Sequence, residues 1–134
     1  MTGEHFDALE TREAAARERE LMARLPAQVG FARKASAHFA RILADVDPQA
    51  VGSRAALARL PVTRKSALMD MQRAELPFGG LNATPASGLA RIFVSPGPIY
   101  DPEGRRPDFW RTARGLFAAG FRAGDVVLNC YSYH

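Results

Sequence analysis

Cysteine and long apolar runs are scarce in this sequence of 134 residues. Cys130 is the only cysteine, so the sequence predicts neither an internal disulfide nor a zinc site built from several cysteines. No stretch approaches the roughly 20 consecutive apolar residues that a membrane-spanning helix needs. The first ten residues are acidic and polar, which argues against a secretory signal. We therefore expect a cytoplasmic protein without a membrane partner.

Lysine is also scarce, although the chain is basic overall. The net charge is +4, and Lys34 and Lys65 are the only lysines among 18 basic residues. The densest basic groups are three pairs spread along the chain, at 33–34, 64–65 and 105–106. A surface that follows a nucleic-acid backbone usually concentrates its charge on one element. The pattern therefore favours solvated helix faces and argues against a nucleic-acid partner.

The first 76 residues are predicted to be mainly helical. Apolar residues recur at helical spacing over 12–24 and over 27–44, with an interruption expected near Ser36. Pro26 either kinks the first helix or opens a second one. Ser53 and Thr63 are expected to cap two short helices that follow. This half therefore supplies helices and no strand.

Residues 77–134 are predicted to form a loop followed by a β-α-β unit. A turn-rich stretch over 77–85 precedes a strand over 89–94, a Pro/Gly loop over 95–104, a helix over 107–120 and a strand over 126–130. Such a crossover normally joins parallel strands. One unit of this kind cannot cover both faces of a sheet. We therefore expect an α/β fold in which residues 1–134 are an incomplete part of a larger domain with a parallel-type sheet.

The loop over 95–104 is the first candidate site, because ligands of α/β proteins bind beyond the carboxyl ends of strands. Backbone N–H groups of Gly and hydroxyl residues there can surround a phosphate. However, Pro96, Pro98 and Pro102 have no N–H to donate, and the G-K-[ST] sequence of a P-loop is absent. From these residues alone, a phosphate loop and a rigid Pro/Gly turn are equally favoured.

The second candidate site is the segment after the last predicted strand. Tyr131 and Tyr133 have the spacing of side chains on one face of a strand and would form an aromatic wall for a planar ligand, although packing in a core or interface is favoured. His134 could serve as a base, but it has no visible orienting partner. Cys130 is expected to be a buried thiol and His38 a structural histidine. No metal site and no catalytic residue are predicted.

Several segments stand in an order that resembles a known family. Residues 57–68 match the pattern L-x-x-L-P-x-T-x-K-x-x-L, and Pro77-Phe78-Gly79 follows. Then come RIFVS at 91–95, AGFRAGDVV at 119–127 and NCYSY at 129–133. In this co-linear order, from about Asp7 onward, the chain resembles the phenylacetate–CoA ligases, which are adenylate-forming (AMP-binding) synthetases.

The resemblance implies an acid–thiol ligase, that is, an acyl-CoA synthetase. Such enzymes use ATP and Mg²⁺ to convert an aryl or acyl carboxylic acid into an acyl-adenylate, and they transfer the acyl group to coenzyme A. The chain would be the N-terminal part of a large adenylation domain, without the family's later nucleotide motifs and catalytic lysine. We therefore expect this chain alone to be inactive. Members of the family often dimerise, so the resemblance admits a homodimer.

The resemblance also assigns site residues. The family's phosphate loop maps onto Ser95, Gly97, Pro98, Ile99 and Tyr100. Asp101 stands where the family has a lysine, and an acidic side chain disfavours a phosphate. The alternative hypothesis is therefore a divergent, non-catalytic binding or interaction module with a degenerate loop. The wall of the family's aryl-acid pocket maps onto the segment with Tyr131, Tyr133 and His134.

Overall fold

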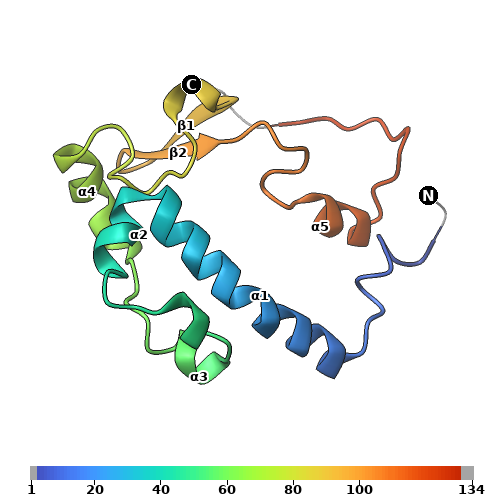
Figure 1. The fold of residues 1–134 in the computed structure, drawn as a ribbon. Helices are drawn as coiled ribbons and strands as arrows, with labels where there is room; N and C mark the ends of the chain where they lie inside the picture. The colour runs from blue at the N-terminus through green and yellow to red at the C-terminus, as the bar shows by residue number, and fades with distance from the viewer. Residues whose placement is uncertain (1–2, 131–134) are drawn as a thin grey trace.

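The computed structural model describes residues 3–130, and Figure 1 shows their arrangement. The first half is helical, with α1 (Ala14–Ala35), α2 (Ala37–Ile42), η1 (Pro48–Ala50), α3 (Arg54–Leu57), η2 (Lys65–Ala67) and α4 (Leu68–Ala74). The second half contains η3 (Ala86–Gly88), β1 (Arg91–Ser95), β2 (Ile99–Glu103) and α5 (Ala113–Ala118). Helices followed by the start of a sheet agree with the predicted α/β class.

The long helix α1 runs through Pro26, so this proline does not open a second helix. The helix ends before Ser36, whose backbone is extended and whose hydroxyl accepts the N–H of Phe39 at 3.3 Å. Ser36 therefore caps α2, which confirms the predicted interruption. Ser53 caps α3 in the same way, because its hydroxyl accepts the N–H of Ala56 at 3.2 Å. The expected cap at Thr63 is absent, since η2 has no side-chain cap.

The main apolar core lies between α1, α2 and the segment that follows them. Val29, Leu43 and Val51 are buried together, and five partly buried side chains pack against them: Phe39, Ile42, Val46, Ala56 and Leu60. Arg33 joins α1 to the next loop by donating to the carbonyl of Val46 at 2.8 Å. The helical half therefore has a small core of its own.

The sheet begins as an antiparallel hairpin, which corrects the predicted parallel-type strand–loop–helix–strand arrangement. The strand predicted over 89–94 is present as β1, but its partner is β2, with Arg91 opposite Glu103 and Ser95 opposite Ile99. Most of the predicted loop over 95–104 is therefore strand. Three residues remain for the turn, and Gly97 supplies its positive φ of 117°. A turn of three residues reverses the direction of the chain, so the two strands that it connects run antiparallel.

The strand predicted over 126–130 is not formed, which is the second correction. These residues have no regular secondary structure, and no neighbouring strand pairs with them in the described part of the chain. Apolar β-branched composition favours an extended backbone, yet a strand needs a partner for its N–H and C=O groups. The preceding helix also starts later than predicted, because Asp108 and Arg111 have positive φ values of 48° and 57°.

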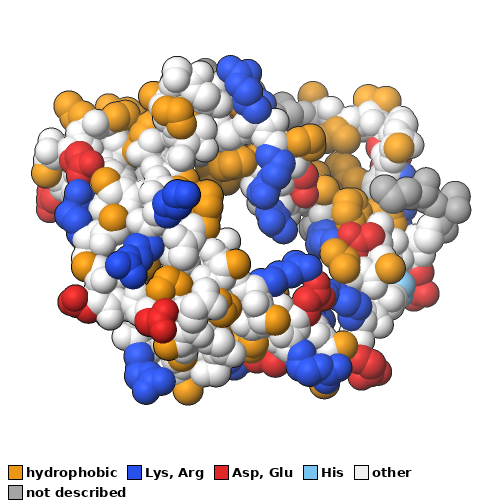
Figure 2. All heavy atoms as spheres, viewed as in Figure 1, with side chains coloured by type: hydrophobic (Ala, Val, Ile, Leu, Met, Phe, Trp, Pro, Cys, Tyr) orange, Lys and Arg blue, Asp and Glu red, His pale blue; other side chains and the backbone are white. Residues whose placement is uncertain are grey.

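The molecule is open rather than closely packed. Its accessible surface is 10228 Å², whereas a compact protein of 14.6 kDa exposes about 6,900 Å². Figure 2 shows an opening through the molecule, with Lys and Arg side chains around it. Many large apolar side chains are exposed, including Val94 and Leu128 at 57% and 85%. Within residues 3–130, no helix is both long enough and apolar enough to cross a bilayer.

Candidate functional site

The five residues that map onto a phosphate loop lie together in the β1–β2 hairpin. Ser95 ends β1, Gly97 and Pro98 form the turn, and Ile99 and Tyr100 begin β2. The hydroxyl of Ser95 donates to the carbonyl of Ile99 at 3.3 Å, so it is used inside the hairpin. No atom lies within 4 Å of the position that a Cβ on Gly97 would occupy. The turn is therefore open to an approaching ligand.

A glutamine from the helical half holds this hairpin. Gln72, on α4, is only 4% exposed. Its Oε1 accepts the N–H of Tyr100 at 2.8 Å, and its Nε2 donates to the carbonyl of Tyr100 at 2.9 Å. A buried amide needs a partner for both of its polar atoms, and Tyr100 supplies both. The role of Gln72 is not predictable from the sequence, because its position in a helix does not reveal a partner 28 residues away.

The space beside this contact is not filled. A cavity of about 200 Å³ lies between α4 and β2, with Leu68, Phe78, Leu81, Ile99, Tyr100 and Pro102 among its lining residues. Phe78, one of these lining residues, is only 2% exposed. The hairpin is therefore connected to α4 by a polar contact beside a void.

A second polar cluster lies at the other end of the hairpin. The carboxylate of Glu103, a buried residue, accepts the indole N–H of Trp110 at 2.8 Å and pairs with Arg91 at 3.0 Å. Arg105 and Arg106 line the adjacent pocket of about 560 Å³. The Glu103 carboxylate is paired with Arg91 and accepts a hydrogen bond from Trp110, so it holds Trp110 against the sheet. The sequence placed Glu103 in the loop predicted over 95–104 and did not indicate this role.

An apolar groove of about 1170 Å³ lies on the C-terminal side of the molecule. Trp110, Leu116, Phe121, Val127, Leu128 and Cys130 are among the residues that line it. Cys130 is exposed, so the prediction of a buried thiol is wrong, because the strand that would have buried it is not formed. Tyr131, Tyr133 and His134, assigned to an aryl-acid pocket, lie outside the described residues.

His38 is a structural histidine, as predicted. It is 9% exposed, its ring Nε2 lies 2.8 Å from the hydroxyl of Thr63, and its backbone N–H donates to the carbonyl of Gly80 at 2.9 Å. Burial lowers the pKa of His38, the positive charge of Arg41 lowers it further, and Glu75 opposes the shift. The contact also explains why Thr63 caps no helix.

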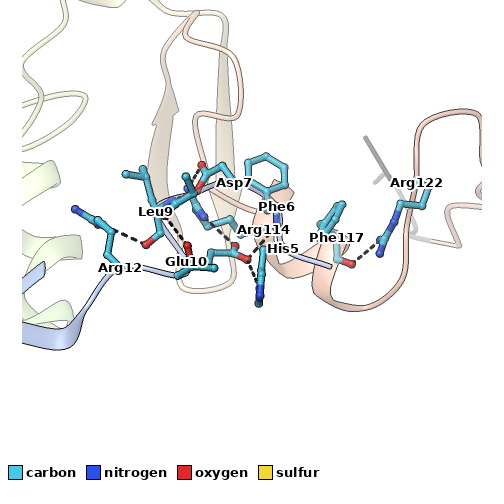
Figure 3. A network of polar contacts seen from close by, with 11 residues as sticks. His5, Phe6, Asp7, Leu9, Glu10, Arg12, Arg114, Phe117 and Arg122 are labelled. Carbon is cyan, nitrogen blue, oxygen red and sulfur yellow. Dashed lines mark hydrogen bonds and ion pairs between the residues drawn. The ribbon is translucent and has the colours of Figure 1, made fainter. Parts of the chain in front are cut away.

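The N-terminal segment is attached to α5, as Figure 3 shows. Arg114 binds both Asp7 and Glu10, with its Nη1 2.8 Å from the Glu10 carboxylate. The same guanidinium lies 5.1 Å from the ring centre of Phe6, which packs edge-on against Phe117. These contacts, called the N-terminal clasp below, join residues more than 100 positions apart. These contacts are not predictable from the sequence, since oppositely charged side chains can pair at any separation along the chain.

Metal ligands do not gather in the described part of the chain. No group of three or more His, Cys, Asp or Glu residues within 3–130 could hold a metal ion. What the hairpin offers instead is an open backbone turn at a fixed position. That arrangement can bind or orient a ligand.

Comparison with known proteins gives relatives of one kind, although no family model matches the chain. It is 37% identical over 95 residues to a phenylacetate–coenzyme A ligase of Aromatoleum evansii, which covers 66% of this chain. It is 33% identical over 119 residues to the phenylacetate–coenzyme A ligase of Thermus thermophilus, which covers 82% of this chain. The chain spans only 20% and 26% of the lengths of these relatives.

Solved structures of a 2-hydroxyisobutyryl-CoA ligase have a similar fold. One, in a postadenylation state with an acyl-AMP, matches 86% of this chain with a TM-score of 0.74 at 27% identity. Another, with 2-HIB-AMP and CoA in the thioesterification state, matches 86% with a TM-score of 0.72. The chain covers 26% of each of these two structures. In sequence and in fold, this chain is therefore a relative of the phenylacetate–CoA ligases, and it matches the N-terminal part of these adenylate-forming CoA ligases.

Proposed function

We propose that residues 1–134 form the N-terminal part of an adenylation domain, in a ligase that joins a small carboxylic acid to coenzyme A. The observation that carries this proposal is the match of 86% of the chain to a CoA ligase that binds an acyl-adenylate. Residues 1–76 would supply the helical part, and the remainder would supply the first hairpin of the sheet. A cytoplasmic location and a homodimer remain predictions.

The proposed reaction has two steps. A carboxylate oxygen attacks the α-phosphorus of ATP, and pyrophosphate leaves with formation of the acyl-adenylate. The thiolate of coenzyme A then attacks the acyl carbon, and AMP leaves. In this proposal the hairpin turn, with Ser95, Gly97, Pro98, Ile99 and Tyr100, contacts the phosphates. Mg²⁺ would accompany ATP, but residues 3–130 provide no metal-binding group, so no step is assigned to a metal held there.

The acid pocket is the second part of the proposal. Tyr131, Tyr133 and His134 would form one wall for the acyl or aryl group. Cys130, the residue that precedes this segment in the sequence, lines the apolar groove together with Trp110 and Leu128. An apolar wall there would favour an acid with an apolar body.

Carboxylate-dependent exchange of labelled pyrophosphate into ATP tests this function. We expect exchange with the complete protein that carries this chain, in the presence of an aryl or short acyl acid. We expect none with the purified 134-residue chain, which serves as the matched control. Exchange by the isolated chain would show that residues 1–134 suffice for adenylation. Absence of exchange from the complete protein with every acid tested would remove the ligase proposal.

A non-catalytic binding module is the second candidate, and the composition of the turn favours it. Pro96 and Pro98 carry no N–H, and the N–H of Tyr100 is taken by Gln72. Asp101 adds a negative charge beside the turn. Calorimetry of the complete protein with ATP and with arylacetates separates the two. Binding without pyrophosphate exchange supports the module, whereas binding with exchange supports the ligase.

A further inference from the structure

Gln72 is the described side chain whose hydrogen bonds join the helical half directly to β2. It lies on α4 and is buried, and both ends of its amide meet the backbone of Tyr100 at 2.8 and 2.9 Å. Only Ile99 separates Tyr100 from Pro98, the last residue of the turn. A change at this contact therefore acts on the turn through a single residue.

Apolar packing around Gln72 does not hold β2 in place, so this role falls to the side-chain amide of Gln72. A cavity of about 200 Å³ adjoins Gln72 between α4 and β2, so β2 does not rest on a filled apolar layer there. On the other edge of the hairpin, β1 exposes Ile92, Phe93 and Val94 by 49%, 44% and 57%. Two hydrogen bonds from a buried amide are directional, whereas apolar contacts beside a cavity are not.

We propose that Gln72 is a positioning residue that fixes the hairpin turn at 96–98 in the place and orientation needed to meet a nucleotide's phosphates. This inference rests on the proposed function for its ligand, and on the Gln72–Tyr100 geometry for its mechanism. The contact also takes the N–H of Tyr100 away from any phosphate. Within 96–100, Pro96 and Pro98 have no N–H, and Ile99 faces its ladder partner Ser95, so Gly97 is the residue whose N–H is left for a phosphate.

Two substitutions separate the hydrogen bonds from the volume of the side chain. Gln72→Met keeps the length of the side chain and removes both polar atoms. In Gln72→Glu, the ionised carboxylate still accepts from the Tyr100 N–H, but it repels the Tyr100 carbonyl. When protonated, the same group can again make both bonds. Burial beside a carbonyl raises the pKa of the introduced carboxyl, so the contact re-forms as the pH falls through that raised value. Gln49→Glu, at an exposed position, is the matched control.

Amide hydrogen exchange measured by NMR on the 134-residue chain tests the contact itself. We expect Gln72→Met to lower the protection factor of the Tyr100 amide about tenfold, the equivalent of one lost hydrogen bond. The protection of Val29, in the core of the helical half, should stay unchanged. Gln72→Glu should lose Tyr100 protection at neutral pH and regain it in acid, while Gln49→Glu should show neither effect. Unchanged Tyr100 protection in Gln72→Met would overturn the inference.

Calorimetric ATP titration of the complete protein tests the consequence for the ligand. We expect Gln72→Met to weaken ATP binding about tenfold, and Gln72→Glu to weaken it only above the pH at which the carboxyl ionises. Equal ATP affinity in the unmodified protein and in Gln72→Met would overturn the inference while leaving the proposed function in place. If the unmodified protein binds no ATP, the proposed function and the phosphate-positioning role of Gln72 both fail. Amide hydrogen exchange would then show only whether Gln72 holds the hairpin.

Discussion

Buried polar side chains organise this protein at the scale of single residues. Gln72 and His38 are 4% and 9% exposed, and both use their side chains to bind a partner in a distant part of the chain. A buried polar group without a partner is costly, so each of these contacts specifies one arrangement of the elements around it. Apolar side chains contribute less to specifying this arrangement, because few of the described ones are fully buried.

The buried histidine predicts a pH dependence of stability. The pKa of His38 is lowered in the folded chain from its ordinary 6.5, chiefly by burial. The unfolded chain therefore binds more protons near this pH, and stability rises with pH. We expect the urea midpoint to be highest above pH 6.5 and to fall as the pH drops below it.

Substitutions test whether His38 causes this pH dependence of the urea midpoint. Gln can place an amide nitrogen near the position of the His38 Nε2, so His38→Gln should make the urea midpoint less dependent on pH between 7.5 and about 5.5. His5→Gln, at a half-exposed side chain, should keep the slope of the unmodified chain. An equal slope in His38→Gln and the unmodified chain would assign the effect to other groups.

At the scale of elements, the hairpin is decided by its turn. Pro96, Gly97 and Pro98 leave few backbone conformations, and the positive φ of Gly97 reverses the chain within three residues. Composition predicted strand β1 correctly, but the same Pro and Gly residues favoured a long loop over 95–104. Ile99, Tyr100 and Pro102 became strand because β1 was available beside them.

A pair of glycine substitutions tests this account of the turn. Gly97→Ala should lower the free energy of unfolding by about 1–2 kcal/mol, because a Cβ strains a backbone with φ of 117° even though the space is open. Gly115→Ala, inside α5 and also with no neighbour within 4 Å, should raise it by about 0.5–1 kcal/mol. Urea unfolding measures both. A similar effect at the two positions would contradict a role for positive φ at Gly97.

At the scale of the whole molecule, several polar contacts join the first 76 residues to the rest, including those of Ser36 and His38 with the carbonyl of Gly80, and two further sets reach β2 and α5. One is the Gln72–Tyr100 contact, and the other is the N-terminal clasp of Arg114 with Asp7 and Glu10. Figure 1 shows the resulting ring-like course of the chain, with α1 along one side and α5 close to the N-terminal segment. The large exposed surface follows from this open shape.

The clasp should be sensitive to salt and to acid. Its charges are partly exposed and therefore screened by salt. Arg114→Gln should increase protease cleavage within residues 5–12, and about 0.5 M salt should do the same to the unmodified chain. Hydrogen bonding to Arg114 lowers the pKa of Asp7 below its ordinary 3.8, so the contribution of Asp7 is present above that pH and is lost as the pH falls through the lowered value.

Limited proteolysis with mass spectrometry measures the clasp. Arg59→Gln, at an exposed arginine on the helical half, is the control and should leave the cleavage pattern unchanged. Identical N-terminal cleavage in Arg114→Gln and in Arg59→Gln would show that the clasp does not hold this segment.

The sequence by itself determined the local features of this protein. The break near Ser36, the cap at Ser53, a strand close to 89–94 and the order of family motifs depend on neighbouring residues, and they were predictable for that reason. Tertiary structure alone decided which elements meet. β2 took the place of a loop because β1 lay beside it, and within residues 3–130 the segment 126–130 has no partner strand. Gln72 and Arg114 acquired their roles through partners 28 and more than 100 residues away, because long-range pairing depends on position in space rather than on local pattern.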